Sequence, residues 1–141
     1  MEVEYKNSAL KKILIAEHDQ ESGEQLMKAL KKYNFTWDLV QDGQQVLNKL
    51  NASEYDAVLL NLVLPTITGI DVLTTIRKPE SQHRNLPVFV MMAFDHQDLI
   101  QTAFKLGAES FFLKSQLNPE AMIGEIAKFF EQQAKNKSST N

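Results

Sequence analysis

Five polar side chains stand at the ends of short apolar runs, and they carry groups from which a reactive site could be built: Glu17, His18, Asp19, Asn61 and Lys114. A carboxylate can hold a cation or pair with an ammonium group. The carboxamide of Asn61 carries no formal charge and is a poor nucleophile toward phosphorus. If the fold brings these groups together, we expect Lys114 to pair with Glu17 or to donate to the amide oxygen of Asn61. Such a site is satisfied without metal or phosphate.

Short apolar runs alternate with helical patterns along the chain, as in a parallel sheet that is covered by helices on both faces. Five strands are predicted, at residues 12–16, 36–40, 57–61, 87–92 and 110–113. Five helices are predicted, at 20–32, from 43 onward, at 70–77, before Gly107 and from Pro119 onward. Asp19, Asp95 and Asn118 are the expected caps of the first, fourth and fifth helices.

The predicted fold is a doubly wound α/β sheet of flavodoxin-like type with strand order 2-1-3-4-5. In such sheets ligands bind outside the carboxyl ends of the strands, at the point where the strand order reverses. The polar groups that follow the first, third and fifth predicted strands therefore meet at one edge of the sheet.

The composition of the chain narrows the range of possible functions. The chain has 141 residues, enough for one domain with a real core, and its hydrophobic fraction of 43% is ordinary for a globular protein. No apolar run approaches the roughly 20 residues that span a bilayer, so no membrane segment is predicted. The net charge of −3 and the scattered lysines argue against nucleic acid as a partner. The absence of cysteine favours a cytoplasmic setting.

Only the ends of the chain look loose. Residues 1–9 and 132–141 are mostly polar and are predicted to be flexible, which leaves a domain at 10–131. Because the chain stops soon after the last predicted helix, a stand-alone domain is expected.

Four segments, in order along the chain, resemble the response-regulator receiver family: 13–19, 55–69, 87–93 and 103–114. Together the resemblance spans residues 11–131. They match a strand that ends in an acidic pair, the phosphoacceptor strand with its later Pro65 and Gly69, a strand that ends near a hydroxyl, and a segment that ends in a lysine. The resemblance implies the receiver fold and a role in two-component, or phosphorelay, signal transduction.

The family pattern assigns a role to each position, and this chain departs from most of them. The phosphoacceptor position is Asn61, and the acidic pair is Glu17 and His18. The hydroxyl position is Met92, whose thioether cannot donate a hydrogen bond. Lys114 is retained. Phe111 holds the position of the aromatic residue whose packing changes with phosphorylation in the family.

These departures predict a degenerate, or pseudo-receiver, site without catalytic activity. The family pocket gathers about three carboxylates around a divalent cation, and the loss of two forfeits about 4 kcal/mol or more per unit of cation charge at an effective dielectric near 20. Mg²⁺ binding is therefore expected to be weak or absent, with Glu17 and Asn61 as weak candidate ligands, and no other cofactor is expected. The chain is predicted not to be an enzyme.

A protein partner, such as a sensor histidine kinase, another signalling protein or a second copy of the chain, is then expected to carry the function. The resemblance places an interaction face over the fourth helix, fifth strand and fifth helix, with these side chains: Phe94, Phe104, Phe111, Phe129 and Phe130.

Two other functions stay open at this point. The receiver could still be phosphorylated by unconventional chemistry, for example on Asp19. A flavin-binding or other nucleotide-binding enzyme shares the architecture, but the acidic residues where the first helix begins would repel a phosphate group.

Overall fold

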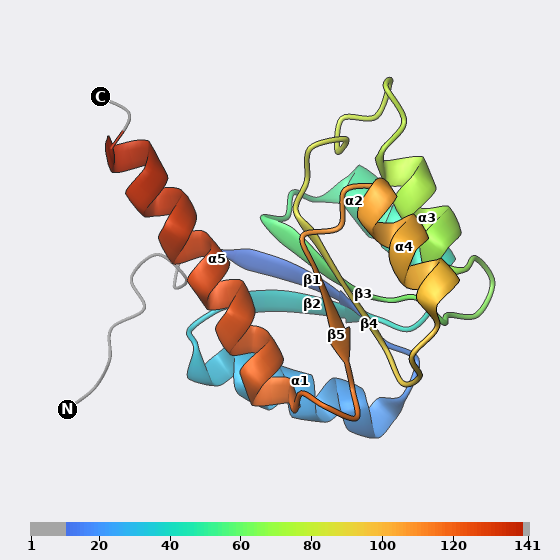
Figure 1. Ribbon diagram of the computed structural model, residues 1–141, viewed down its shortest axis with the longest axis horizontal. Coiled ribbons are helices and arrows are strands. Elements are labelled where there is room, and N and C mark those ends of the chain that lie inside the picture. Colours follow the sequence, from blue (N-terminus) through green and yellow to red (C-terminus); the bar gives the residue numbers. More distant parts are fainter. Residues whose placement is uncertain (1–10, 140–141) are drawn as a thin grey trace.

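In the part of the chain that the structure describes, five parallel strands form one sheet in the order β2-β1-β3-β4-β5 (Figure 1). The computed structural model describes residues 11–139. The strands are β1 (Lys12–Ala16), β2 (Thr36–Val40), β3 (Ala57–Asn61), β4 (Val88–Met92) and β5 (Ser110–Leu113). The predicted fold and strand order are confirmed.

The register of the strands brings their carboxyl ends together. Ala16 lies opposite Leu60, and Asn61 lies opposite Met91. Met92 in turn lies opposite Leu113. The residues that follow β1, β3 and β5 therefore lie at the same edge of the sheet, with the end of β4 between those of β3 and β5.

Among residues 11–139, five helices cover the sheet in two layers: α1 (Gln20–Lys32), α2 (Gly43–Ala52), α3 (Gly69–Ile76), α4 (Gln97–Lys105) and α5 (Pro119–Ser139). Helices α1 and α5 lie on one face, and α2, α3 and α4 lie on the other (Figure 1). Alternate residues of each central strand enter the two apolar cores, so that Ile13 and Ile15 pack with α1 and α5 while Leu14 packs on the other side.

Helix α4 begins differently from the prediction. Its N-cap is His96, whose Nδ1 accepts a hydrogen bond from the backbone N–H of Leu99 at 3.4 Å, and not Asp95. The carboxylate of Asp95 accepts instead from the side chain of Gln97 at 2.6 Å. The helix ends at Lys105, and Gly107 follows with φ +81°.

Helix α5 is longer than predicted, because it continues through residues 132–139, which were assigned to a flexible tail. A polar stretch extends an existing helix without a new nucleation cost. The predicted flexible segment 1–9 and the last two residues lie outside the described residues. Across 11–139, no helix combines the length and apolarity needed to cross a membrane.

Candidate functional site

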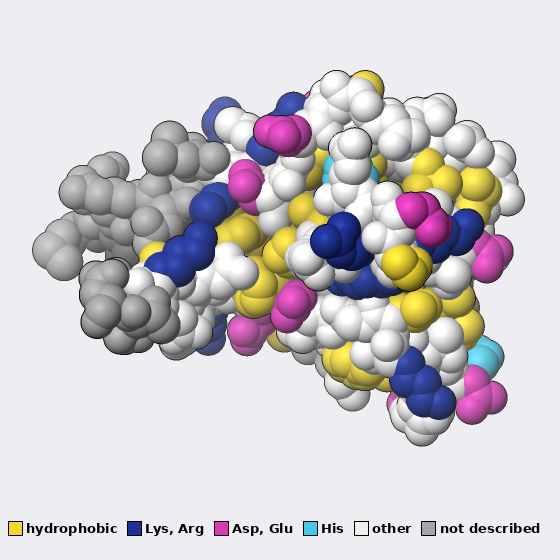
Figure 2. Space-filling view, turned by 90° about the horizontal axis from the view of Figure 1, so that it is seen from above, with side chains coloured by type: hydrophobic (Ala, Val, Ile, Leu, Met, Phe, Trp, Pro, Cys, Tyr) yellow, Lys and Arg dark blue, Asp and Glu magenta, His cyan; other side chains and the backbone are white. Residues whose placement is uncertain are grey.

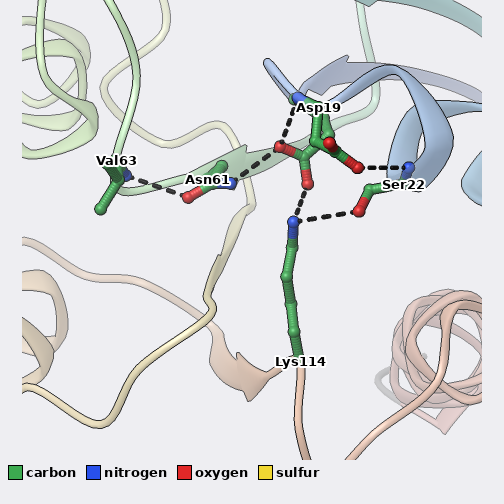
Figure 3. A network of polar contacts seen from close by, with 6 residues as sticks. Asp19, Ser22, Asn61, Val63 and Lys114 are labelled. Atoms are coloured by element: carbon green, nitrogen blue, oxygen red, sulfur yellow. Dashed lines mark hydrogen bonds and ion pairs between the residues drawn. The ribbon is translucent and has the colours of Figure 1, made fainter.

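Figure 3 shows a network of polar contacts that joins Asp19, Ser22, Asn61, Val63 and Lys114. Glu17, at the carboxyl edge of the sheet, is the residue at its centre. It follows β1 and is only 1% exposed. Its Oε1 forms an ion pair with the ammonium group of Lys114. Its Oε2 accepts hydrogen bonds from Nδ2 of Asn61 at 2.9 Å and from the backbone N–H of Asp19 at 3.3 Å. Both oxygens of this buried carboxylate are therefore engaged.

Asn61 is held at both ends of its amide. While its Nδ2 donates to Glu17, its Oδ1 accepts from the backbone N–H of Val63 at 3.0 Å. An aspartate here would have no proton to give to Glu17, so the neutral amide fits a place where a second carboxylate would be repelled. Of the two alternatives expected for Lys114, the structure shows the pairing with Glu17, while the amide oxygen of Asn61 accepts from Val63.

The loop after β3 is pressed against the strand at Gly69. Its backbone N–H donates to the carbonyl of Leu62 at 3.0 Å. A Cβ at this residue would lie 2.5 Å from Cα of Leu62 and 2.7 Å from the carbonyl oxygen of Asn61. Only glycine allows this approach, which fixes the turn that carries the Val63 N–H to the Asn61 side chain.

Lys114 reaches the site from the end of β5. Its backbone N–H donates to the carbonyl of Met92 at 2.9 Å, and its side chain is 21% exposed. Its ammonium group also donates to Oγ of Ser22 at 3.4 Å. Ser22 was not predicted as a site residue, although it lies in the first turn of a helix that starts beside Glu17, and that position is visible in the sequence.

Asp19 serves the start of α1. Its Oδ2 accepts from the backbone N–H of Ser22 at 2.9 Å, as predicted for a cap. This hydrogen bond is the main reason that the pKa of Asp19 lies below its ordinary value, with a smaller contribution from the charge of Lys114. The carboxylate is exposed and does not take part in the contacts of Glu17.

The other predicted site residues lie at different depths. His18 is exposed beside the network. Met92 is 2% exposed and fills the core at the end of β4. Phe111 is half-buried and packs against the core under α2, α3 and α4.

The predicted interaction face is only partly available. Phe94 and Phe104 are 72% and 49% exposed. Phe130 is 3% exposed and packs against Phe35, while Phe129 stacks edge-on against Phe89. The inclusion of Phe130 was wrong, because its ring is buried in the core between α5 and the sheet. Phe129 is partly buried, and its place in the interaction face stays a prediction.

The donor set does not fit a divalent cation. Mg²⁺ needs several free oxygen ligands, and the oxygens of Glu17 and Asn61 already accept from an ammonium group or from N–H groups. In the part of the chain that the structure describes, no three His, Asp or Glu side chains gather as a possible metal site. A cation would first have to displace Lys114.

The sequence pattern of the response regulator receiver domain matches residues 13–127. The chain is 34% identical over 103 residues to the transcriptional regulatory protein QseB of Haemophilus influenzae, covering 73% of this chain and 45% of that protein. It is 27% identical over 103 residues to the transcriptional regulatory protein CusR of Escherichia coli, covering 73% of this chain and 44% of that protein. The chain thus spans less than half the length of these curated relatives.

Solved structures show the same fold. A CheY-like response regulator receiver domain protein from Methanospirillum hungatei superposes with a TM-score of 0.79 at 18% identity, covering 90% of this chain and 98% of that one. A response regulator receiver domain from Francisella superposes with a TM-score of 0.77 at 21% identity, covering 87% and 98%. These matches favour a receiver over the flavin-binding or nucleotide-binding alternative.

Proposed function

Because this chain belongs to the response-regulator receiver family, we propose that it is a receiver domain of two-component signal transduction that works without phosphorylation, since its phosphoacceptor position is Asn61. The closed network around Glu17 carries this proposal. Its carboxylate is neutralised by Lys114, and the amide at the phosphoacceptor position is bonded at both ends. No nucleophilic oxygen is left at residue 61, and no free oxygen set is left for a metal.

Signalling by this domain then depends on protein–protein contacts. The proposed partners are a sensor histidine kinase, another cytoplasmic signalling protein or a second copy of the chain, meeting the exposed rings of Phe94 and Phe104. QseB and CusR are transcriptional regulatory proteins. The prediction that nucleic acid is not a partner is therefore proposed only for the domain described here.

Incubation with acetyl phosphate and Mg²⁺, followed by intact-mass measurement, tests the proposal. We expect no added phosphoryl mass on the protein. A phosphoryl group at any residue would overturn the proposal, and peptide mapping would then tell Asp19 from other acceptors.

Thermal unfolding with increasing Mg²⁺ tests the same pocket by a second route. Because the oxygens of Glu17 are engaged, we expect the unfolding temperature to stay unchanged at low millimolar Mg²⁺. A clear stabilisation in that range would contradict the closed network.

A further inference from the structure

A groove lies at the opposite end of the molecule, where the strands begin. It has a volume of about 540 Å³ and lies between the end of α3, the loop before β4 and the turn between α4 and β5. Its lining residues are Arg77, Arg84, Asn85, Lys105, Leu106, Gly107 and Glu109. Figure 2 looks onto this end of the molecule and shows Lys and Arg side chains near the middle of the face.

Arg77 forms the fixed wall of the groove. Its Nε donates to the carbonyl of Leu106 at 2.8 Å, and its Nη1 donates to the carbonyls of Leu86 and Arg84 at 2.8 and 3.1 Å. Its Nη2 donates to the carbonyl of Gly107 at 3.2 Å. All these partners are neutral, so they orient the guanidinium without cancelling its charge.

Gly107 makes room for this arrangement. Its backbone has φ +81°, and a Cβ there would lie 3.2 Å from Nε of Arg77. Burial lowers the pKa of Arg77, but its guanidinium remains charged at neutral pH. The groove therefore contains a permanent, half-buried cation.

The charge of the groove is unbalanced. Within the described residues, no carboxylate lies within ion-pair distance of Arg77, Arg84 or Lys105. Glu109 is the only acid of the lining, so three cations face one anion. This positive groove stands out on a chain whose net charge is −3, and it attracts anionic groups.

The donors that remain free indicate which anion fits. The N–H groups of Arg77 are largely used by carbonyls, so the fixed guanidinium offers no free parallel pair of N–H groups to a phosphate ion. Arg84 and Lys105 are exposed, and their long side chains can each pair with a separate carboxylate. Nucleic acid needs a longer cationic surface than three side chains provide.

We propose that this groove is a docking surface for an acidic segment of a partner protein, rich in Asp or Glu. The inference goes beyond the proposed function and does not depend on it, because the groove and the pocket around Glu17 lie at opposite ends of the sheet.

Titration of a capped hexaglutamate peptide into the ¹⁵N-labelled protein tests this surface. We expect the amide signals of residues 83–86 and 105–109 to shift, and binding to weaken as salt is raised. The double variant R84E/K105E should bind about tenfold more weakly or worse, since it reverses two exposed charges and leaves Arg77 in place. Shifts confined to other residues would overturn the proposal.

The matched control is K28E/K31E, which makes the same change in net charge on the exposed side of α1. It should bind the peptide within about twofold of the unchanged protein. Equal loss of binding in both variants would show an effect of net charge alone and would overturn the proposal. So would shifts of the same amides by inorganic phosphate at the same concentration, or by a short DNA duplex that binds more tightly than the peptide.

Discussion

The two ends of the sheet treat charge in opposite ways. At the carboxyl end, the buried carboxylate of Glu17 meets the ammonium of Lys114 and two N–H donors, so the local charge is cancelled. At the amino end, Arg77 is held by neutral carbonyls and faces only Glu109 among the acids of its groove. A cancelled pair stabilises the fold but leaves little attraction for a ligand, whereas an uncancelled cation can attract one. We therefore expect this domain to bind its partner at a surface other than the pocket around Glu17.

The replacement of Glu17 by glutamine should have the largest effect on stability. The change removes the negative charge that pairs with Lys114, whose side chain is 21% exposed. It also places the amide N–H donor of the new glutamine beside the Nδ2 donor of Asn61. We expect a loss of about 3 kcal/mol in the free energy of unfolding, measured with urea. Glu21→Gln, at an exposed position of α1, should change it by less than about 0.5 kcal/mol. Similar losses in both variants would show that the network does not stabilise the pocket.

Arg77→Met tests the other end. Methionine keeps the apolar stem but removes the donors to Leu106, Leu86 and Gly107. A loss of about 2 kcal/mol is expected, because these carbonyls then depend on water. The exposed Arg84→Met variant serves as control and should be nearly neutral in stability. An unaffected Arg77→Met protein would mean that the groove has no fixed cationic wall.

Asn61→Asp should open the closed network. It places a carboxylate oxygen about where Nδ2 now lies, 2.9 Å from Oε2 of Glu17. Without divalent ions, the repulsion and the lost hydrogen bond should cost about 1 to 2 kcal/mol. Millimolar Mg²⁺ should recover part of this loss, since two carboxylates can share a cation.

Calorimetry with and without Mg²⁺ checks this prediction. The exposed Asn51→Asp variant adds the same charge elsewhere and should show no response to Mg²⁺. If Asn61→Asp is as stable as the original protein and equally indifferent to Mg²⁺, the amide at residue 61 is not what closes the pocket.

The sequence predicted the strands well because their signals are local. The buried run at 57–61 was placed correctly, as were β1, β2 and β5. The cap of α4 was missed because two polar residues, Asp95 and His96, compete for that position and only the backbone geometry decides between them. The end of α5 was missed because residues 132–139 are mostly polar and were not expected to bury apolar surface. A helix that is already formed can continue without such burial.

In the candidate site, only the contacts between two side chains could be predicted from the sequence. The pairing of Glu17 with Lys114 follows from opposite charges at the ends of β1 and β5. The orientation of the Asn61 amide depends on the backbone N–H of Val63, and no sequence pattern shows where a loop N–H points. The groove of Arg77 was missed for the same reason, since its partners are carbonyls from two separate segments, the loop before β4 and the turn after α4.

A third network, near the start of β1, gives the smallest predicted effect and sharpens the comparison. The hydroxyl of Tyr55 donates to Oδ2 of Asp38 at 2.5 Å, and Nζ of Lys12 lies 3.4 Å from the same oxygen. The Tyr55 hydrogen bond, with help from Lys12, holds the pKa of Asp38 below its ordinary value of 3.8. Burial raises the pKa of Tyr55, so its hydroxyl remains a donor at neutral and acidic pH.

A carboxylate with a lowered pKa adds stability above its ordinary pKa of 3.8, and this stability is lost as the pH falls through the lower value of the folded state. Tyr55→Phe should therefore flatten the fall in stability below about pH 4, by less than about 1 kcal/mol because Asp38 is partly exposed. Urea unfolding at several acidic pH values measures this slope, and an unchanged slope would contradict the assigned hydrogen bond.

This network lies toward the amino end of the sheet and is nevertheless closed like the Glu17 pocket. Whether an end of the sheet can attract a ligand thus depends on the local balance of charge, and not on its place in the fold.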